Sequence, residues 1–380
     1  MAKEGSLLSI FFRKDVETLR NPTEVLKTLS LKSQDKSYQF QRLYRNLYNP
    51  EFYYLAYNNI CTGQGNMTAG TDGETIDGMS DKRIQKIIAS LKDHSYQPKP
   101  ARREYIPKKN SSRKRPLGIS SATDKLVQEV VRMILESIYE PNFSSDSHGF
   151  RPKRSCHTAL KHIDINFKGA VWFVEGDIKA CFDSFDHHVM VQILRERIAD
   201  EYFLGLIWKF LRAGYMEQWT FHKTYAGTPQ GSGVSPILAN IYLDKLDSFM
   251  TRYKTIFDTG SAKNRKVNNA YVKARGQYHN LKKSFADKWE TASSDEKKEM
   301  DKQLRSARNK MFAIPYYANC NSKYKCLHYC RYADDFIISV IGSRQDAERV
   351  KADIRKFLAD TLKLELSEEK NKGYAFFGLC

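Results

Sequence analysis

The residues of this chain best suited to chemistry are three aspartates that follow apolar segments. Asp334 and Asp335 end the sequence Tyr-Ala-Asp-Asp, which lies between two short apolar runs, and this pattern predicts a tight β-hairpin with two carboxylates at its tip. Asp177 closely follows a third apolar run. Neighbouring carboxylates repel each other unless a cation neutralises them, and Mg²⁺ binds through one or two carboxylates together with substrate phosphates. Three carboxylates at two strand ends therefore predict phosphoryl transfer with two magnesium ions.

Two simpler interpretations stay open for these aspartates. An Asp pair in a turn is often only turn chemistry, and Asp177 could be an ordinary residue at a strand end. The overall charge favours the chemical interpretation: the chain of 380 residues has a formal net charge of +18 and a pI near 9.4. The charge is spread along the chain, which indicates a polyanionic partner, either nucleic acid or an anionic membrane surface.

Composition also excludes several classes of protein. No run approaches the ~20 apolar residues that span a bilayer. The start of the chain has neither the long apolar segment of a signal peptide nor the acid-poor composition of a transit peptide. Seven cysteines, an odd number, favour reduced thiols in a reducing compartment. A zinc site is an alternative for one cluster that lacks a Cys-x2-Cys pair, although core packing is the simpler explanation of its members, Cys320, Cys326, His328 and Cys330.

Hydrophobic periodicity places the elements that must position the aspartates. Strands are expected at 170–174, 327–331 and 336–340, and a β-hairpin at 102–119. Helices are expected at 81–91, 124–140, 156–167, 187–198, 236–250 and 345–362. Thr123 or Asp124 is the expected N-cap of the second of these helices. Residues 1–60 look helical and 61–80 form a glycine-marked loop, whereas 251–320 are rich in Lys, Asn and Ser and predict an inserted, exposed helical pair.

Further residues could complete a nucleotide site. If Asp177 binds metal, the ring of Phe182 could lie beneath the sugar of an incoming nucleotide and block a 2′-hydroxyl; otherwise Phe182 is a buried aromatic. Lys108 and Arg115 stand on opposite arms of the expected hairpin and could grip a triphosphate, or be solvated surface charges. The glycine-rich segment 228–233 lets backbone approach a nucleotide but lacks the trailing Lys-Ser/Thr of a P-loop.

These segments together resemble the group II intron-encoded reverse transcriptases, also called maturases, and their mitochondrial-like branch in particular. The likeness covers roughly residues 65–380 and is specific, because the order and spacing of the blocks agree as well as the residue types. The matching blocks are Thr71-Asp72-Gly73, 106–108 with 115–119, His148-Gly149-Phe150-Arg151-Pro152, 176–183, Gly227-Thr228-Pro229-Gln230-Gly231, 332–335, 364–367 with Lys370, and Phe376-Phe377-Gly378.

The resemblance implies an α+β fold with the fingers and palm of a right-hand polymerase, in which an antiparallel palm sheet with packed helices carries the aspartates. It implies that Asp177, Asp334 and Asp335 hold two Mg²⁺ ions, with Mn²⁺ a possible substitute, and that Ile178 lends its backbone carbonyl. The nucleotide-binding residues would be Lys108, Arg115, Phe182, Gln230 and either Lys370 or Lys372. Phe376, Phe377 and Gly378 would support the primer end.

The expected domains are an N-terminal helical extension of the fingers at 1–60, fingers at 61–168, a first palm part at 169–250, the insertion at 251–320 and a second palm part at 321–380. Arg42 and Arg45 are candidate RNA contacts in the extension, because basic residues follow phosphates. The chain ends just after the last palm motif, so we expect a fragment without the thumb that family members carry. The insertion is expected to be an exposed arm without a catalytic part, with RNA contact or self-association as alternatives.

The expected function is RNA-directed DNA synthesis, together with binding of intron RNA that aids splicing and retrohoming. The implied partners are group II intron RNA, an RNA template with a DNA primer, dNTPs and, in a homodimer, a second copy of the chain, with no membrane. A non-catalytic splicing cofactor, a reverse transcriptase of another bacterial lineage and an RNA-dependent RNA polymerase remain alternatives. The bacterial cytoplasm is the expected location, with an organelle as the alternative.

Overall fold

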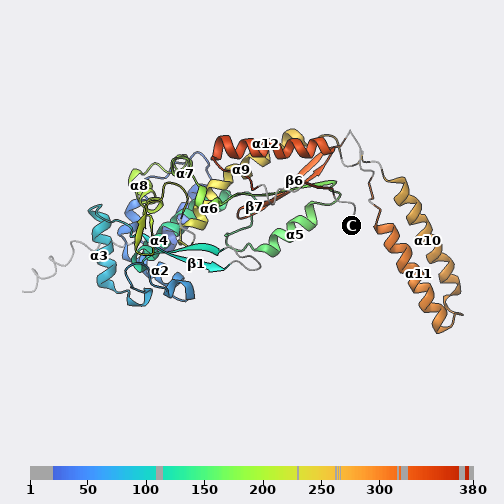
Figure 1. Cartoon of the computed structure of the whole chain (residues 1–380), viewed down its shortest axis with the longest axis horizontal. Helices are drawn as coiled ribbons and strands as arrows, with labels where there is room; N and C mark the ends of the chain where they lie inside the picture. Colours follow the sequence, from blue (N-terminus) through green and yellow to red (C-terminus); the bar gives the residue numbers. More distant parts are fainter. Residues whose placement is uncertain are drawn as a thin grey trace, which may run out of the picture. The chain divides into compact units, whose positions relative to one another are not determined.

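The structure is a computed structural model that describes residues 20–107, 114–228, 231–261, 263, 265, 267–314, 316–317, 324–367 and 373–375 (Figure 1). The chain forms two compact units, each made of separate stretches of sequence. Unit 1 comprises Met1–Phe143 and Phe182–Tyr242, and unit 2 comprises Ser144–Cys181 and Leu243–Cys380. Each unit has a four-stranded sheet of its own.

Helix α4 (Ala122–Tyr139) is the centre of unit 1, because its apolar stripe packs against α1 and α2. Its N-cap is Ser121, whose side chain accepts a hydrogen bond from the backbone of Asp124, so the expectation of Thr123 or Asp124 as cap was wrong. The other helices of the unit are α1 (Pro22–Ser33), α2 (Pro50–Ile60), α3 (Asp81–Lys92), α7 (His187–Arg195), α8 (Glu201–Leu211) and the short η1 (Tyr44–Tyr48), η2 (Gln64–Met67), η3 (Ile76–Gly78) and η4 (Glu140–Asn142).

The sheet of unit 1 has the strand order β2-β1-β4-β5. Strands β1 (Ala101–Pro107) and β2 (Lys114–Ile119) form the antiparallel hairpin that the sequence predicts, with Arg115 opposite Ile106. Strand β4 (Tyr215–Glu217) pairs parallel to β1 and antiparallel to β5 (Thr220–His222). The sequence did not lead us to expect this second hairpin or α8.

The sheet of unit 2 is fully antiparallel, with the order β6-β7-β3-β8. Its strands are β3 (Trp172–Asp177), β6 (Cys326–Tyr332), β7 (Asp335–Ile341) and β8 (Gly373–Ala375). Asp177 is the last residue of β3, so the strand extends three residues further than its apolar run. Helices and sheets together confirm the α+β class.

The two faces of this sheet are covered by different helices, as Figure 1 shows for α5 (Cys156–Asn166) and α12 (Arg344–Leu362). Side chains alternate between faces along a strand. The face that carries Phe173, Cys330 and Ile337 packs against α5. The other face, with Val174, Leu327, Ile338 and Val340, is buried, and α12 contacts β3. The sheet is therefore a rigid support with both faces in use.

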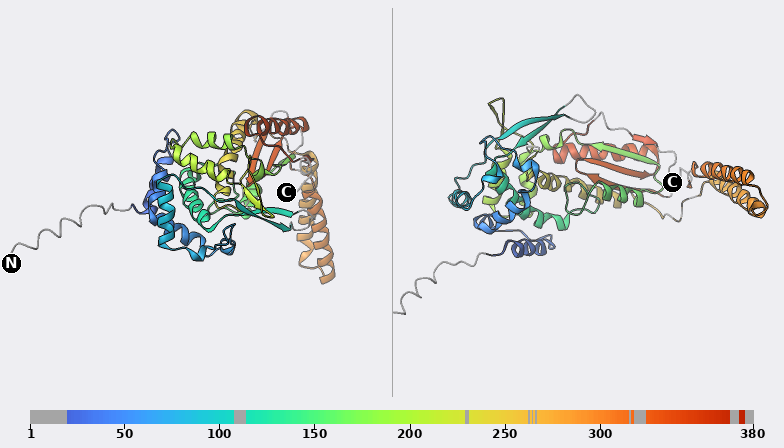
Figure 2. Two further views of the ribbon diagram at one scale, coloured as in Figure 1. Left: turned by 60° about the vertical axis from the view of Figure 1, so that its left-hand side comes forward. Right: turned by 90° about the horizontal axis from the view of Figure 1, so that it is seen from below.

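Helices α9 (Ser235–Phe257), α10 (Asn269–Trp289) and α11 (Ser294–Phe312) complete the described fold. Helices α10 and α11 lie side by side and are joined by Glu290–Ser293 (Figure 2), which agrees with the helical pair expected in this region. Helix α9 runs seven residues beyond position 250, where the insertion was expected to begin. No helix among the described residues is long and apolar enough to cross a bilayer.

Candidate active site

Asp177 and Asp335 lie directly opposite each other on neighbouring strands of unit 2. They are the last pair in the antiparallel register of β3 and β7. Directly opposed residues of an antiparallel pair have Cα atoms about 4.5–5.5 Å apart, and their side chains point to the same face. Folding thus brings together two carboxylates that are 158 positions apart in the sequence.

Asp334 belongs to a two-residue hairpin loop next to this pair. Tyr332 pairs with Asp335, which leaves only Ala333 and Asp334 to connect β6 and β7. Ala333 has φ of 56°, the left-handed conformation that a tight hairpin loop requires at its first position. Residues other than glycine rarely adopt this conformation, so contacts with other parts of the protein must hold the loop.

Arg331 provides part of that support from inside the protein. Its side chain is fully buried, and its Nη1 donates a hydrogen bond of 2.8 Å to the carbonyl oxygen of Ala333. Its Nε and Nη2 bind the two carboxylate oxygens of Asp247 on α9, at 2.8 and 2.6 Å. Burial disfavours the charged guanidinium, but the attraction of Asp247 more than offsets it, so the pKa of Arg331 is raised.

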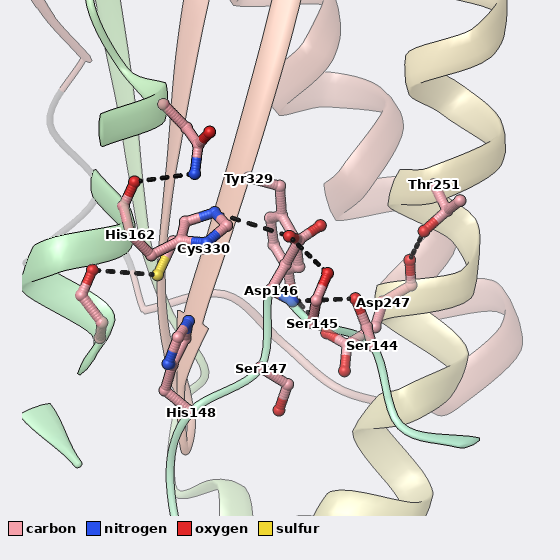
Figure 3. A network of polar contacts seen from close by, with 12 residues as sticks. Ser144, Ser145, Asp146, Ser147, His148, His162, Asp247, Thr251, Tyr329 and Cys330 are labelled. Carbon is pink, nitrogen blue, oxygen red and sulfur yellow. Dashed lines mark hydrogen bonds and ion pairs between the residues drawn. The ribbon is translucent and has the colours of Figure 1, made fainter. Parts of the chain in front are cut away.

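The loop formed by residues 144–148 extends the same network (Figure 3). Arg331 Nη2 donates to Ser147 Oγ at 2.8 Å, and Tyr329 donates its hydroxyl proton to Asp247 at 2.8 Å. The backbone of Arg331 bonds on both sides to the loop, donating to Asp146 and accepting from His148. The motif His148-Gly149-Phe150 is therefore attached to the strand that leads into the aspartate hairpin.

Two glycines allow the close packing around the aspartates. A Cβ atom on Gly149 would lie 2.2 Å from the backbone nitrogen of Ala333. A Cβ atom on Gly176 would lie 2.0 Å from the ring of Phe336, the residue opposite it across the sheet. Both glycines occur in the motifs identified from the sequence, and each is required because other atoms occupy the space of a side chain.

Ile178 continues the chain beyond Asp177 and pairs with Leu366. The two bonds of this bridge are made by its neighbours: Ser367 donates to the carbonyl of Asp177 at 2.8 Å, and Lys179 donates to the carbonyl of Glu365 at 2.9 Å. The carbonyl of Ile178 consequently points away from this partner. The segment 364–367 is thus brought to the end of β3.

A hollow of about 350 Å³ opens between α5 and the aspartate-bearing face of the sheet. Asp177, Tyr332 and Asp335 line one end of it, and Leu160 and Ile163 of α5 line the side. Carboxylates thus meet an apolar wall, an arrangement that suits a ligand with a charged and an apolar part.

Within the described part of the chain, no three His, Cys, Asp or Glu side chains converge closely enough to form a metal site. The donor set nevertheless suits Mg²⁺, which needs only one or two carboxylates beside substrate phosphates and water. The cysteine cluster suits zinc less well. Cys326 Sγ lies 3.4 Å from His328 Nε2, but Lys254 and Asp258 also contact this sulfur. Cys330 is packed in the core, as expected, and burial raises its pKa to about 12.

None of the residues named above around the aspartates is an expected nucleotide-binding residue. Lys108, Gln230, Lys370 and Lys372 lie outside the described residues, as do Phe376, Phe377 and Gly378. Arg115 is exposed on β2 and Phe182 is half-buried in the short helix α6 (Cys181–Ser184), and both belong to unit 1. In that unit Thr228, the first residue of the glycine-rich segment, donates its backbone N–H to the carbonyl of Phe182 at 2.6 Å.

The N-terminal candidates Arg42 and Arg45 are both exposed. They line a hollow of about 340 Å³ together with Arg20 and Lys32. Their neighbour Tyr44 is buried and donates to the carbonyl of Leu91, and burial raises the pKa of Tyr44 to about 12. Arg42 and Arg45 thus remain available to a phosphate, whereas Tyr44 is a packing residue.

Sequence reasoning missed Arg331, Asp247 and Ser147. The signal for Arg331 was present: it is a charged residue within a strand whose neighbours are apolar, immediately before the hairpin motif. Asp247 had a weaker signal, an acid on the apolar side of a helix. Ser147 had none, because its role depends on a contact 184 positions away.

Comparison with known proteins bears on the family of this chain. Residues 106–269 match the family model described as reverse transcriptase (RNA-dependent DNA polymerase). The chain is 48% identical over 347 residues to the group II intron-encoded protein LtrA of Lactococcus lactis subsp. cremoris, covering 91% of this chain and 56% of that protein. It is 41% identical to an uncharacterized 91 kDa protein in cob intron of Schizosaccharomyces pombe. That match covers 93% of this chain and 42% of the Schizosaccharomyces protein.

A relative of similar length is protein YkfC of Escherichia coli K12, which is 32% identical over 359 residues, with 90% of this chain and 84% of that protein covered. By contrast, the chain spans about half the length of the two intron proteins. The protein belongs to the family of group II intron-encoded reverse transcriptases.

Proposed function

We propose that this chain is the RNA-directed DNA polymerase part of a group II intron-encoded protein. The observation that carries the proposal is the register of β3 and β7, which pairs Asp177 with Asp335 beside the loop that holds Asp334. Membership of the family and the match to a reverse transcriptase model support it. The chain would extend a DNA primer on an RNA template with dNTPs.

In this proposal Asp177, Asp334, Asp335 and the backbone carbonyl of Ile178 hold two Mg²⁺ ions, for which Mn²⁺ could substitute. When bound, the ions supply Lewis acidity toward the primer 3′-hydroxyl and charge neutralisation on the pyrophosphate. Arg331 keeps the loop of Asp334 in place through Ala333. The hollow lined by Tyr332 offers room for the primer-terminal nucleotide.

The remaining roles stay predictions from the resemblance. Phe182 would exclude ribonucleotides, whereas Lys108, Arg115, Gln230 and Lys370 or Lys372 would bind the nucleotide and its phosphates. Phe376, Phe377 and Gly378 would support the primer. Arg42 and Arg45 would contact RNA, and their exposure beside a basic hollow supports this.

Intron RNA is the further partner that we propose, with roles in splicing and retrohoming. The name of the Lactococcus relative supports an intron RNA partner, and its bacterial source supports the bacterial cytoplasm as the location. A mitochondrial relative in Marchantia polymorpha keeps the organellar alternative. A homodimer also remains a proposal.

Primer extension with Mg²⁺ and dNTPs tests the metal assignment. We expect Asp177→Asn and Asp334→Ala to slow extension by roughly 10³-fold or more, which corresponds to about 4 kcal/mol of activation free energy. Affinity for RNA should change only a few-fold, because the basic residues are untouched. Asp360→Asn, on the exposed side of α12, is the matched control and should extend normally.

Two outcomes would count against the proposal. Normal extension by Asp334→Ala would remove that aspartate from the metal site. A wild-type chain that binds RNA tightly but extends no primer, even with Mn²⁺, would favour the alternative of a non-catalytic splicing cofactor.

A further inference from the structure

Helices α10 and α11 pack along a single narrow seam. The half-buried residues of α10 recur at alternating spacings of three and four, and so do those of α11, which is the pattern of a two-stranded coiled coil. Apart from Met311, neither helix buries a residue. The seam residues are Tyr271, Ala274, Tyr278, Leu281 and Phe285 of α10, and Lys297, Met300, Leu304, Ala307 and Met311 of α11.

The two sides of this seam differ in charge. In a right-handed helix the residue after each seam position lies on one side and the residue before it on the other. Helix α11 runs opposite to α10 and faces it across the seam. These two reversals cancel, so the residues that follow seam positions lie on the same side of the pair in both helices. The row after the seam has five cations and one acid: Arg275, Lys282, Lys298, Arg305, Arg308 and Asp301. The row before it has two of each: Lys273, Lys310, Glu296 and Glu299.

We call the row after the seam the basic flank. Its formal charge is +4, whereas the formal charge of the row before the seam is zero. The cations of the basic flank are exposed. Among the described residues, Arg275, Lys282 and Arg305 form no ion pair, although acids lie elsewhere on the arm, and Lys298 pairs only with Asp295 at 3.1 Å. The flank is therefore a set of mostly uncompensated charges.

Arg275 and Arg308 stand at the same level of the hairpin. Arg275 is fourteen residues before the end of α10 at Trp289, and Arg308 is fourteen residues after the start of α11 at Ser294. Like charges at facing positions beside a seam destabilise a helical pair. A sequence selected only for stability would place an acid at one of these positions, so the pair indicates an anion that is bound from outside.

We propose that the basic flank of the α10–α11 arm binds the phosphate backbone of RNA. Lys298 to Arg308 span ten residues, or about 15 Å of helix, long enough to contact several phosphates. Phe312 ends the same row with 39% of its surface exposed, and Arg308 lies 5.5 Å from its ring centre. Cations beside an exposed aromatic are typical of RNA-binding surfaces. The proposal rests on the proposed function, which supplies RNA as the polyanion.

The test uses the full chain and two matched double variants. Arg275→Gln with Arg308→Gln removes two charges from the basic flank, and Lys273→Gln with Lys310→Gln removes two from the other. The probes are a labelled RNA duplex of about two turns, a labelled oligouridylate and a phosphatidylserine vesicle. Affinity is measured by fluorescence anisotropy, or by co-sedimentation for the vesicle, over a series of salt concentrations.

We expect the basic-flank variant to bind at least one RNA probe about tenfold more weakly at ~0.1 M salt, because two phosphate contacts are lost. Its slope of log affinity against log salt should fall by about 1.8 for the duplex or about 1.4 for the single strand. The control variant should stay within about twofold of wild type. Thermal unfolding of the basic-flank variant should be unchanged or occur at a higher temperature, since a repulsion is removed.

Equal losses in both variants would mean that only net charge matters and would overturn the proposal, as would no loss in either. Loss of vesicle binding with RNA affinity intact would assign the flank to membranes instead. Primer extension on a short, saturating template should be normal in both variants. Absence of extension by the wild type would count against the polymerase function and leave the binding comparison interpretable.

Discussion

Arg331 places a full charge within a strand whose other residues are mostly apolar, an arrangement that is stable only while Asp247 accompanies it. Removing one member of a buried ion pair leaves the other uncompensated and costs about 3–5 kcal/mol. Replacing both members by apolar residues is often neutral. The pair therefore contributes little net stability, and its value lies in the third bond, from Arg331 to Ala333.

This distinction gives a prediction with two variants. Arg331→Met should lower the free energy of unfolding by about 3–5 kcal/mol. Adding Asp247→Leu should recover much of that loss, apart from the hydroxyl of Tyr329 that loses its acceptor. The double variant should still extend primers slowly, with a reduced kcat at saturating dNTP, because the loop has lost its donor. Denaturant unfolding and steady-state kinetics measure the two effects, and wild-type kcat in the double variant would contradict the positioning role.

His148 is a buried titratable group next to the same strand. Burial, followed by electrostatic interactions with Arg154, His162, Arg151 and Arg331, lowers its pKa to about 4. Its Nδ1 lies 2.9 Å from Thr158 Oγ1, and its buried Nε2 has no hydrogen-bond partner in the part of the chain that the structure describes. The folded protein therefore holds the neutral ring, whereas the unfolded chain binds a proton near pH 6.5.

The sign of the pH effect follows from this lowered pKa. The unfolded state binds more protons between pH 6.5 and 4, so the contribution of His148 to stability is present above pH 6.5 and is lost as the pH falls toward 4. His148→Asn keeps a group at the Nδ1 position but does not titrate. We expect its unfolding free energy to depend less on pH in this window, as followed by denaturant unfolding at several pH values. An unchanged pH slope would show that the ring is protonated in the fold.

At the scale of elements, two glycines of unit 2 should respond oppositely to the same change. Gly149 lies against the backbone of Ala333, so Gly149→Ala should displace the aspartate loop and cost about 1–3 kcal/mol, with a fall in primer extension. Gly276 is within α10 with open space around it, so Gly276→Ala should stabilise the helix by about 0.5–1 kcal/mol and leave extension unchanged. Thermal unfolding and extension assays on both variants check this pair, and similar behaviour of the two would contradict it.

Elements with a clear period were predictable from the sequence, and those without one were not. The stripe of α4 and the apolar runs of β6 and β7 mark their elements directly. Helix α8 comes from a short and mostly apolar run, and such a run does not by itself distinguish a helix from a buried strand. Strands β4 and β5 have three residues each, and their turn uses Gln218 and Trp219 at φ of 48° and 64°, where the usual signal would be Asn-Gly.

In the candidate site, too, some residues could be predicted from the sequence and others could not. Spacing and residue type were enough to select Asp177, Asp334 and Asp335 and to expect that folding brings the two segments together. The support of the hairpin loop was not predictable, because it depends on contacts between segments that share no local pattern. Ser147, for example, is an ordinary loop serine until the strand of Arg331 lies beside it.

At the scale of the whole molecule, the described cations fall mostly into two groups, those paired with acids of the fold and those exposed without an acidic partner. Part of it neutralises buried acids, as Arg331 does for Asp247, and part pairs along helices, as Lys254 does with Asp258 at 2.7 Å. Arg42, Arg45 and most cations of the basic flank have no such acidic partner among the described residues, Lys298 with Asp295 being the exception. A net charge of +18 thus gives the class of ligand, while only the structure separates cations that serve the fold from those exposed to a partner.

The division of the sequence between the two units also bears on how the protein is made. The chain passes from one unit to the other three times, after Phe143, Cys181 and Tyr242, and the last passage falls inside the continuous helix α9. A ribosome therefore cannot deliver unit 1 complete until Tyr242 has emerged, and by then part of unit 2 is already outside. Neither unit can be expressed as one uninterrupted piece, so any shortened version must respect both at once.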